Sequence, residues 1–139
     1  MIILDTNLIS EISRPVPNAN VKMWMMAQPE LELFLCDIVV MQLSFGASRF
    51  HLRSGSDRYN VTLDALFFSF HGRILGFDLR AAIATGRLRA KREHVGRPIS
   101  TQDAMIAAIC LNHGATLATR NTKDFEGLDL KLINPFEGG

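Results

Sequence analysis

The chain has 139 residues, a hydrophobic content of 47% and a formal net charge of +1. This length and hydrophobic content predict a single domain, residues 1–139, built around one core. The near-neutral charge excludes a strongly basic or acidic chain, so the overall charge indicates no particular partner.

Two further features indicate a cytoplasmic protein. Asp5 interrupts the apolar start, and no apolar run approaches the length of a membrane span, so we expect neither a secretory signal nor membrane insertion. Cys36 and Cys110 both lie in apolar segments, which is typical of buried, reduced thiols.

The first half of the chain predicts strands alternating with helices. Residues 2–4 form an apolar run too short for a helix, so we expect a buried parallel strand there. Asparagine and aspartate precede several of the helical segments, where their side chains are placed to cap them. In chain order we expect a strand at 2–4, a helix at 8–13, a short helix capped by Asn18 or Asn20 and closed by Pro29, a strand at 33–36, a helix capped by Asp37, and a helix ended by His71 and Gly72.

The second half continues this alternation. In chain order we expect a strand at 74–77, a helix from 79 to about 94 capped by Asp78, a buried helix at 104–112 opened by Ser100, a strand at 115–119, a polar loop at 120–125, and a strand at 130–133. Strands that alternate with helices form a parallel sheet with helices on both faces. The fold class is therefore α/β, with three α/β/α layers and a parallel sheet of four or five strands.

Three aspartates stand where such a sheet brings side chains together. Asp5 and Asp124 each follow a strand, and Asp103 heads a helix that points to the same edge. Taken singly, Asp103 has an alternative role in a capping box after Ser100, and Asp124 an alternative as a solvated loop residue. Taken together, the three carboxylates predict one site.

Carboxylates without histidine or cysteine at ligand spacing suit a hard cation, so we expect Mg²⁺, with Mn²⁺ as a substitute, rather than Zn²⁺. Such an ion activates water for attack on a phosphodiester. Residues expected to hydrogen-bond the metal's water or a phosphate are Thr6, Asn7, Thr119 and Asn121. The basic run 87–92, followed by Arg97, offers charge for phosphate binding, although a solvated helix face explains the run equally well.

The motifs of the chain resemble those of the PIN-domain family, specifically toxins of the VapC type including the FitB-like branch. They are the residues 1–7 (MIILDTN), 43–46 (LSFG), 96–100 (GRPIS) leading to Asp103-Ala104, 115–121 (ATLATRN) with Asp124-Phe125, and 133–136 (INPF). The resemblance implies a PIN-like fold and a magnesium-dependent endoribonuclease, the toxin of a bacterial toxin–antitoxin pair. It also implies a homodimer, a VapB-type antitoxin partner, and assemblies of the two on operator DNA.

One position departs from the family pattern. The family's acids map onto Asp5, Asp103 and Asp124 as metal-binding and catalytic residues, but a glutamate is expected immediately before Leu43 and the chain has Gln42. An amide has almost the shape of a carboxylate but carries no charge and is a poor proton acceptor. We therefore expect weakened metal binding and slow cleavage, with position 42 still part of the catalytic group.

Two alternatives remain beside the nuclease. A phosphatase of the haloacid-dehalogenase type needs a second acid two residues after the first, where this chain has Asn7. A PIN-fold subunit without catalysis, which serves only to bind an antitoxin and co-repress, is favoured by Gln42. The region around Trp24, Met25, Met26, Phe45 and Phe50 is richer in Met and aromatic residues than one small core needs. It is either ordinary core packing or, in part, a groove for an amphipathic antitoxin segment.

Overall fold

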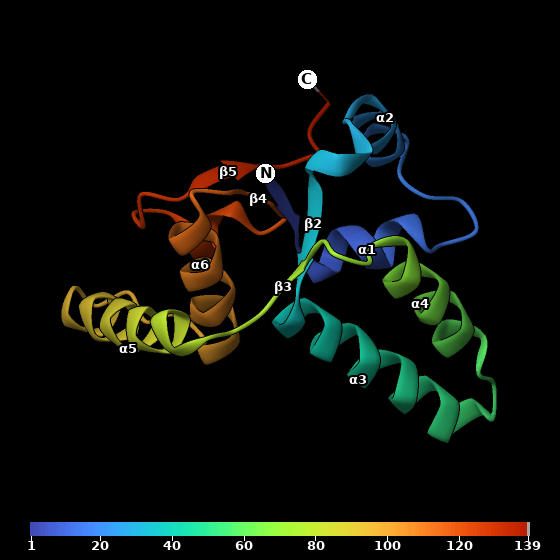
Figure 1. The fold of residues 1–139 in the computed structure, drawn as a ribbon, viewed down its shortest axis with the longest axis horizontal. Helices are drawn as coiled ribbons and strands as arrows, with labels where there is room; N and C mark the ends of the chain where they lie inside the picture. The colour runs from blue at the N-terminus through green and yellow to red at the C-terminus, as the bar shows by residue number, and fades with distance from the viewer. Residues whose placement is uncertain (139) are drawn as a thin grey trace.

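The structure, a computed structural model, describes residues 1–138. Its centre is a sheet of five parallel strands in the order β3-β2-β1-β4-β5, which confirms the predicted α/β class (Figure 1). The strands are β1 (Ile2–Leu4), β2 (Leu33–Cys36), β3 (Ile74–Leu75), β4 (Thr116–Ala118) and β5 (Lys131–Ile133).

Helices connect the strands in the predicted order. They are α1 (Thr6–Ile12), α2 (Ala19–Ala27), α3 (Asp37–Ser54), α4 (Arg58–Ser69), α5 (Leu79–His94) and α6 (Thr101–His113), with two 3₁₀ turns, η1 (Glu30–Glu32) and η2 (Thr122–Phe125). Neither 3₁₀ turn was predicted, because each is a single turn with no periodic apolar pattern. Among the helices of residues 1–138, none combines the length and the apolarity that crossing a bilayer demands.

The direction of winding reverses at the centre of the sheet. From β1 the chain moves outward to β2 and β3, and then it returns across the sheet to β4 on the other side of β1. Because crossovers between parallel strands are right-handed, α1 to α4 lie on one face and α5 and α6 on the other. Ligand sites of open α/β sheets form at the carboxyl ends of the strands beside such a reversal, here β1 and β4.

The helices form two groups away from the sheet. Figure 1 shows α3 and α4 running outward as a pair, and α5 packed beside α6 on the opposite side of the view. Gly55 joins α3 to α4 with a φ of 77°, a left-handed conformation that glycine adopts without the strain of a Cβ atom. The α6 helix is buried along most of its length, as its apolar sequence predicts.

Three of the predicted helix caps are present. The side chains of Asn18, Asp78 and Ser100 each accept a hydrogen bond from a backbone N–H in the first turn of the following helix. The prediction for Asp37 is wrong. Cys36 is the N-cap residue of α3, and the carboxylate of Asp37 instead accepts the backbone N–H of Phe77 at 2.9 Å. That bond takes the Phe77 N–H away from the sheet, and β3 ends at Leu75 rather than at the predicted residue 77.

Both cysteines are buried free thiols, as expected. Burial raises the pKa of Cys36 to about 11 and raises that of Cys110 well above its ordinary value. Each thiol therefore stays protonated at neutral pH and behaves as a small apolar side chain of the core.

We expect Leu117→Ala in β4 to lower the free energy of unfolding by about 2–5 kcal/mol, because the side chain is fully buried and its removal leaves a cavity. Leu52→Ala is the matched control, since Leu52 is 85% exposed and its loss should change stability by less than about 0.5 kcal/mol. Urea unfolding of the three proteins measures both values. Similar losses in the two variants would contradict the assignment of the core.

Candidate active site

Asp5 lies at the carboxyl end of β1 and is only 6% exposed. Its two oxygens are held by neighbouring donors: the Thr6 backbone N–H at 2.8 Å, the Thr119 hydroxyl at 2.7 Å and the Asn7 amide at 3.3 Å. The parallel register, which sets Leu4 against Ala118, places Asp5 beside Thr119 although 114 residues separate them along the chain. The two central strands thus fix the position of the carboxylate.

Thr119 and Asn7 connect this carboxylate to the loop that follows β4. Thr119 is fully buried, donates to Asp5 and accepts the Asn121 backbone N–H at 3.1 Å. The side-chain oxygen of Asn7 accepts the Arg120 backbone N–H at 3.1 Å. The loop that carries Asp124 is therefore tied to the end of β1 by Thr119, which follows β4, and by Asn7 in the first turn of α1.

Asp103 and Asp124 line one cavity of about 470 Å³, together with the basic side chains of Arg92, Arg97 and Lys123. Asp103 lies in the first turn of α6, where its backbone N–H donates to Ser100 at 3.1 Å. Asp124 lies in η2 and is exposed. The structure thus brings two of the three predicted acids into one cavity, and Asp5 is coupled to both of them electrostatically.

The charges of the three acids act on one another. Desolvation is the main cause that raises the pKa of Asp5, and the charge of Asp124 adds to it against the hydrogen bonds from Thr119, Thr6 and Asn7. Desolvation also raises the pKa of Asp103, and the charges of Asp5 and Asp124 raise it further. Carboxylates that repel one another in this way are stabilised by a bound cation.

The donor chemistry therefore fits a hard divalent cation, since all candidate ligands are carboxylate or amide oxygens. Within residues 1–138, however, no three Asp, Glu, His or Cys side chains form a group with the geometry of a metal site. The fourth residue expected in the metal site, at position 42, is the uncharged Gln42. The acids thus offer suitable oxygens without converging on one point in this arrangement.

Gln42 lies next to the site and is held on both sides. Its side-chain oxygen accepts a hydrogen bond from the Thr6 hydroxyl, and its amide group donates to Gln102 at 2.9 Å. Gln102 directly precedes Asp103 in α6. The amide of Gln42 therefore links α1, α3 and α6 at the edge of the site, a connection that sequence reasoning did not anticipate.

The predicted substrate-binding residues fall into two groups. Thr6, Asn7 and Thr119 are engaged in hydrogen bonds inside the site. Asn121 and Arg97 are exposed at its rim, where Arg97 lines the cavity of Asp103 and Asp124 and forms an ion pair with Glu126 at 3.9 Å. Contact of any of them with substrate remains a prediction.

Arg92 is a buried residue of the site that the sequence did not reveal. It is 8% exposed, and its guanidinium donates to three backbone oxygens: those of Arg97 at 2.6 Å, Glu126 at 3.1 Å and Asp124 at 3.4 Å. It therefore holds the η2 segment and the loop before α6 in place. The sequence of the basic run 87–92 gives no signal that distinguishes the buried Arg92 from the exposed basic residues of the run.

The expected apolar groove differs from the observed one. A cavity of about 560 Å³ extends from Thr6 and Gln42 between α1, α3 and α4, and of the five residues predicted to form a groove only Phe50 lines it. Trp24 and Met25 pack against the core instead, and Met26 and Phe45 are 77% and 61% exposed. Trp24 and Met25 thus follow the core-packing alternative and Phe50 lies in the cavity, whereas contact of Met26 or Phe45 with an antitoxin stays a prediction.

The architecture and the acids at the β1–β4 edge define the class of protein, and a family model agrees: the PIN domain model matches residues 2–130, and the chain belongs to this family. A curated relative, "VapC ribonuclease Y4jK" of Sinorhizobium fredii, is 36% identical over 99% of both chains.

Two solved structures also match the chain over nearly its full length. "Crystal Structure of FitAcB from Neisseria gonorrhoeae" matches with a TM-score of 0.88 and 35% identity over 99% of both chains. VapBC2 from Rickettsia felis, bound to a DNA fragment from its promoter, matches with a TM-score of 0.76 and 26% identity over 96% of this chain and 98% of that one.

We expect Asp5→Asn to gain stability relative to the wild type as the pH rises to neutral in the absence of divalent metal, because it removes a buried charge. The pKa of Asp5 is raised in the folded state, so between its ordinary value of 3.8 and the raised value the folded protein holds a proton that the unfolded chain has lost. The stability due to this group is complete below pH 3.8 and is lost as the pH rises through the raised pKa. The gap between variant and wild type should close on acidification.

Urea unfolding in EDTA from pH 4 to 8 measures this gap. The exposed Asp64 of α4 supplies the control, since Asp64→Asn removes the same charge without changing a buried group. A gap that widens toward acid pH would contradict the raised pKa of Asp5.

We expect Arg92→Lys to lower the free energy of unfolding by about 1–3 kcal/mol, because a lysine keeps the charge but cannot reach three carbonyl oxygens in a planar fork. Hydrogen exchange should become faster at residues 121–127. The control is Arg89→Lys, an exposed position on the same helix. Equal exchange rates in the two variants would mean that Arg92 does not hold the segment of Asp124.

Proposed function

We propose that the chain is a divalent-metal-dependent endoribonuclease, the toxin of a VapBC-type toxin–antitoxin pair that acts in the cytoplasm on RNA phosphodiesters. The observation that carries this proposal is the buried Asp5 at the β1–β4 edge, hydrogen-bonded through Thr119 and Asn7 to the loop of Asp124, which lines one cavity with Asp103. The relative named VapC ribonuclease supports the reaction class, since it matches the chain over its full length.

Asp5, Asp103 and Asp124 would hold the metal, which in this proposal is Mg²⁺ with Mn²⁺ as a substitute. A hard cation bound by carboxylates supplies an activated water and stabilises negative charge on a phosphate. Asp5 is held in position by its three donors, so its orientation is fixed before the cation arrives. Arg97 and Lys123, at the rim of the cavity that Asp103 and Asp124 line, supply positive charge for the phosphate. Cleavage leaves the phosphate on the 5′ side.

Gln42 limits this activity. At an effective dielectric constant near 20, one charge pair at 4 Å is worth about 4 kcal/mol before desolvation is subtracted, and a net loss of about 1.4 kcal/mol already weakens binding tenfold. With three acids instead of four, metal binding persists in weakened form and RNA cleavage is slow.

The partners of the chain are an antitoxin of the VapB type and, through it, operator DNA. The supporting observations are full-length similarity to FitB in FitAcB and to the DNA-bound VapBC2 complex. The apolar cavity between α1, α3 and α4 begins at Thr6 and Gln42, and an antitoxin segment lying in it would reach the edge of the catalytic site. The toxin itself is a homodimer.

A second candidate is a PIN-fold subunit that binds antitoxin and represses transcription without cleaving RNA. The side chain of Gln42 favours it, since its oxygen and its amide nitrogen both have neutral hydrogen-bond partners in Thr6 and Gln102. Position 42 thus fits the structure without a metal. RNA cleavage distinguishes the two candidates.

We expect Gln42→Glu to tighten Mg²⁺ binding about tenfold and to raise the rate of RNA cleavage with it, because one added carboxylate serves both. Isothermal titration measures the first and single-turnover cleavage over a magnesium series measures the second. Gln102→Glu separates ligation from charge alone, since it adds the same charge at the hydrogen-bond partner of Gln42 and should raise the rate less than Gln42→Glu does.

Asp5→Asn in the Gln42→Glu background should abolish cleavage while the protein stays folded. Equal rates for the present chain and its Gln42→Glu variant at every magnesium concentration would show that position 42 is outside the metal site. No cleavage by either protein would favour the second candidate.

A further inference from the structure

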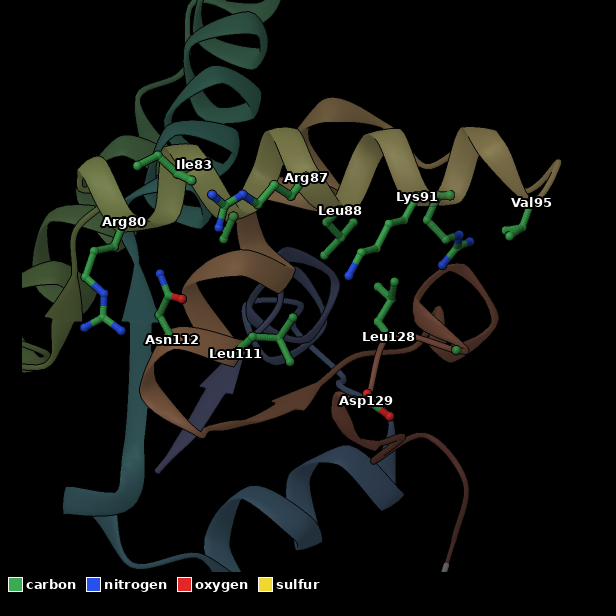
Figure 2. A pocket seen from close by; sticks show the side chains of 13 residues that line it. Arg80, Ile83, Arg87, Leu88, Lys91, Val95, Leu111, Asn112, Leu128 and Asp129 are labelled. Carbon is green, nitrogen blue, oxygen red and sulfur yellow. The ribbon is translucent and has the colours of Figure 1, made fainter.

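A third cavity of the described chain lies away from the predicted catalytic carboxylates. It has a volume of about 680 Å³ and is formed by α5, the last turn of α6 and the loop at residues 127–129 (Figure 2). Figure 2 shows the side chains of Arg80, Arg87 and Lys91 projecting from α5 toward Leu111, Asn112 and Leu128 on the opposite wall.

The basic wall of this cavity carries charge that is not used within the protein. Arg80, Arg87 and Lys91 are exposed, and their side chains form no hydrogen bond or ion pair with the other residues of 1–138. Positions 80, 87 and 91 fall on one face of a helix and span roughly 16 Å along its axis at 1.5 Å per residue. Asp129 is the one acid that lines the cavity. A row of unpaired cations at this spacing suits a ligand with several negative charges along its length.

The other surfaces of the cavity suit an unpaired base. Ile83 and Leu88 on α5 and Leu128 on the opposite wall supply an apolar floor between the two walls. The side-chain nitrogen of Asn112 is buried and has no hydrogen-bond partner, although an amide of this kind both donates and accepts, as the edge of a base does. A cavity of this composition accepts the face of a base on the floor, its edge at Asn112 and its phosphates at the basic wall.

The cavity also adjoins the catalytic one. Arg92 lines both, and Arg97 and Lys123 continue the positive charge on the other side of it, next to Asp103 and Asp124. One polymer can therefore occupy the two cavities together, which favours RNA over a separate acidic peptide.

We propose that this cavity is an RNA-binding subsite that holds a nucleotide of single-stranded RNA outside the cleavage position. The inference rests on the proposed function, whose substrate it describes further. It also divides the basic run 87–92 by role: Arg87 and Lys91 bind phosphates, Arg92 supports the catalytic loops, and Arg89 lines none of the cavities described here.

Binding of a fluorescently labelled single-stranded RNA, measured by anisotropy in EDTA to prevent cleavage, tests the proposal. Arg87→Ala should weaken binding about fivefold to tenfold near 0.1 M salt and reduce the salt slope of log K by about 0.7, the value of one phosphate contact on a single strand. Arg89→Ala is the matched control: the same residue type, exposed, on the same helix and two positions away. It should bind RNA within about twofold of the wild type and keep the slope.

Asn112→Leu supplies a variant that keeps the fold, because it replaces an amide whose buried nitrogen has no partner by an apolar group of similar size. It should weaken RNA binding without changing the salt slope. Thermal unfolding of each variant confirms that the protein is folded at the temperature of the measurement.

Equal affinity and equal slope for Arg87→Ala and Arg89→Ala would overturn the proposal. Polyglutamate that binds the wild type and is lost in Arg87→Ala, while RNA binding persists, would assign the cavity to an acidic peptide and overturn it as well. Duplex DNA bound as tightly as the RNA, with the same loss in Arg87→Ala, would replace RNA by DNA.

Cleavage of the same RNA by the Gln42→Glu variant in Mg²⁺ tests the proposed function separately. Cleavage by Gln42→Glu, together with equal RNA binding by Arg87→Ala and Arg89→Ala, would support the nuclease and contradict the subsite. Loss of RNA binding in Arg87→Ala, without cleavage by Gln42→Glu, would support the subsite and contradict the nuclease.

Discussion

The hydrogen bond from Thr119 to Asp5 is the interaction on which the site depends. It joins the ends of β1 and β4, the two strands between which the sheet reverses its winding, and it exists because the parallel register sets these ends side by side. A carboxylate that is 6% exposed is costly to keep charged, and donors from Thr119, Thr6 and Asn7 offset part of that cost. The fold thus holds an acid where an uncompensated one would be unfavourable.

In the described chain, the basic side chains near Asp5, Asp103 and Asp124 form no ion pair with these acids. Arg92 is the buried cation of this region, yet its guanidinium binds three backbone carbonyl oxygens and no carboxylate. Arg97 is paired with Glu126. Within the described chain the negative charge of Asp5, Asp103 and Asp124 is therefore not neutralised by an ion pair, and positive charge is used instead to shape the loops around them. That division suits a site whose counter-ion comes from solution.

The sequence predicted the structure correctly where the residues that decide it lie close together along the chain. Short apolar runs predicted all five strands, and Asn18, Asp78 and Ser100 were recognisable as caps because capping involves residues within one turn. The acids were predicted from their positions after strands. Asp37 and Arg92 could not be interpreted, because their partners, at Phe77 and at residues 124–126, lie in other elements. The hydrogen bonds of Gln42 depend on how α3 meets α1 and α6, which no local pattern records.

The two buried thiols have a practical consequence for experiments on this chain. Cys36 and Cys110 are both enclosed by the core, and their raised pKa values keep the reactive thiolate scarce at neutral pH. A maleimide or spin-label reagent would therefore leave both native cysteines largely unmodified in the folded state. Two cysteines introduced at exposed positions would become the fast-reacting groups, so distances between chosen elements could be measured without first removing the native thiols.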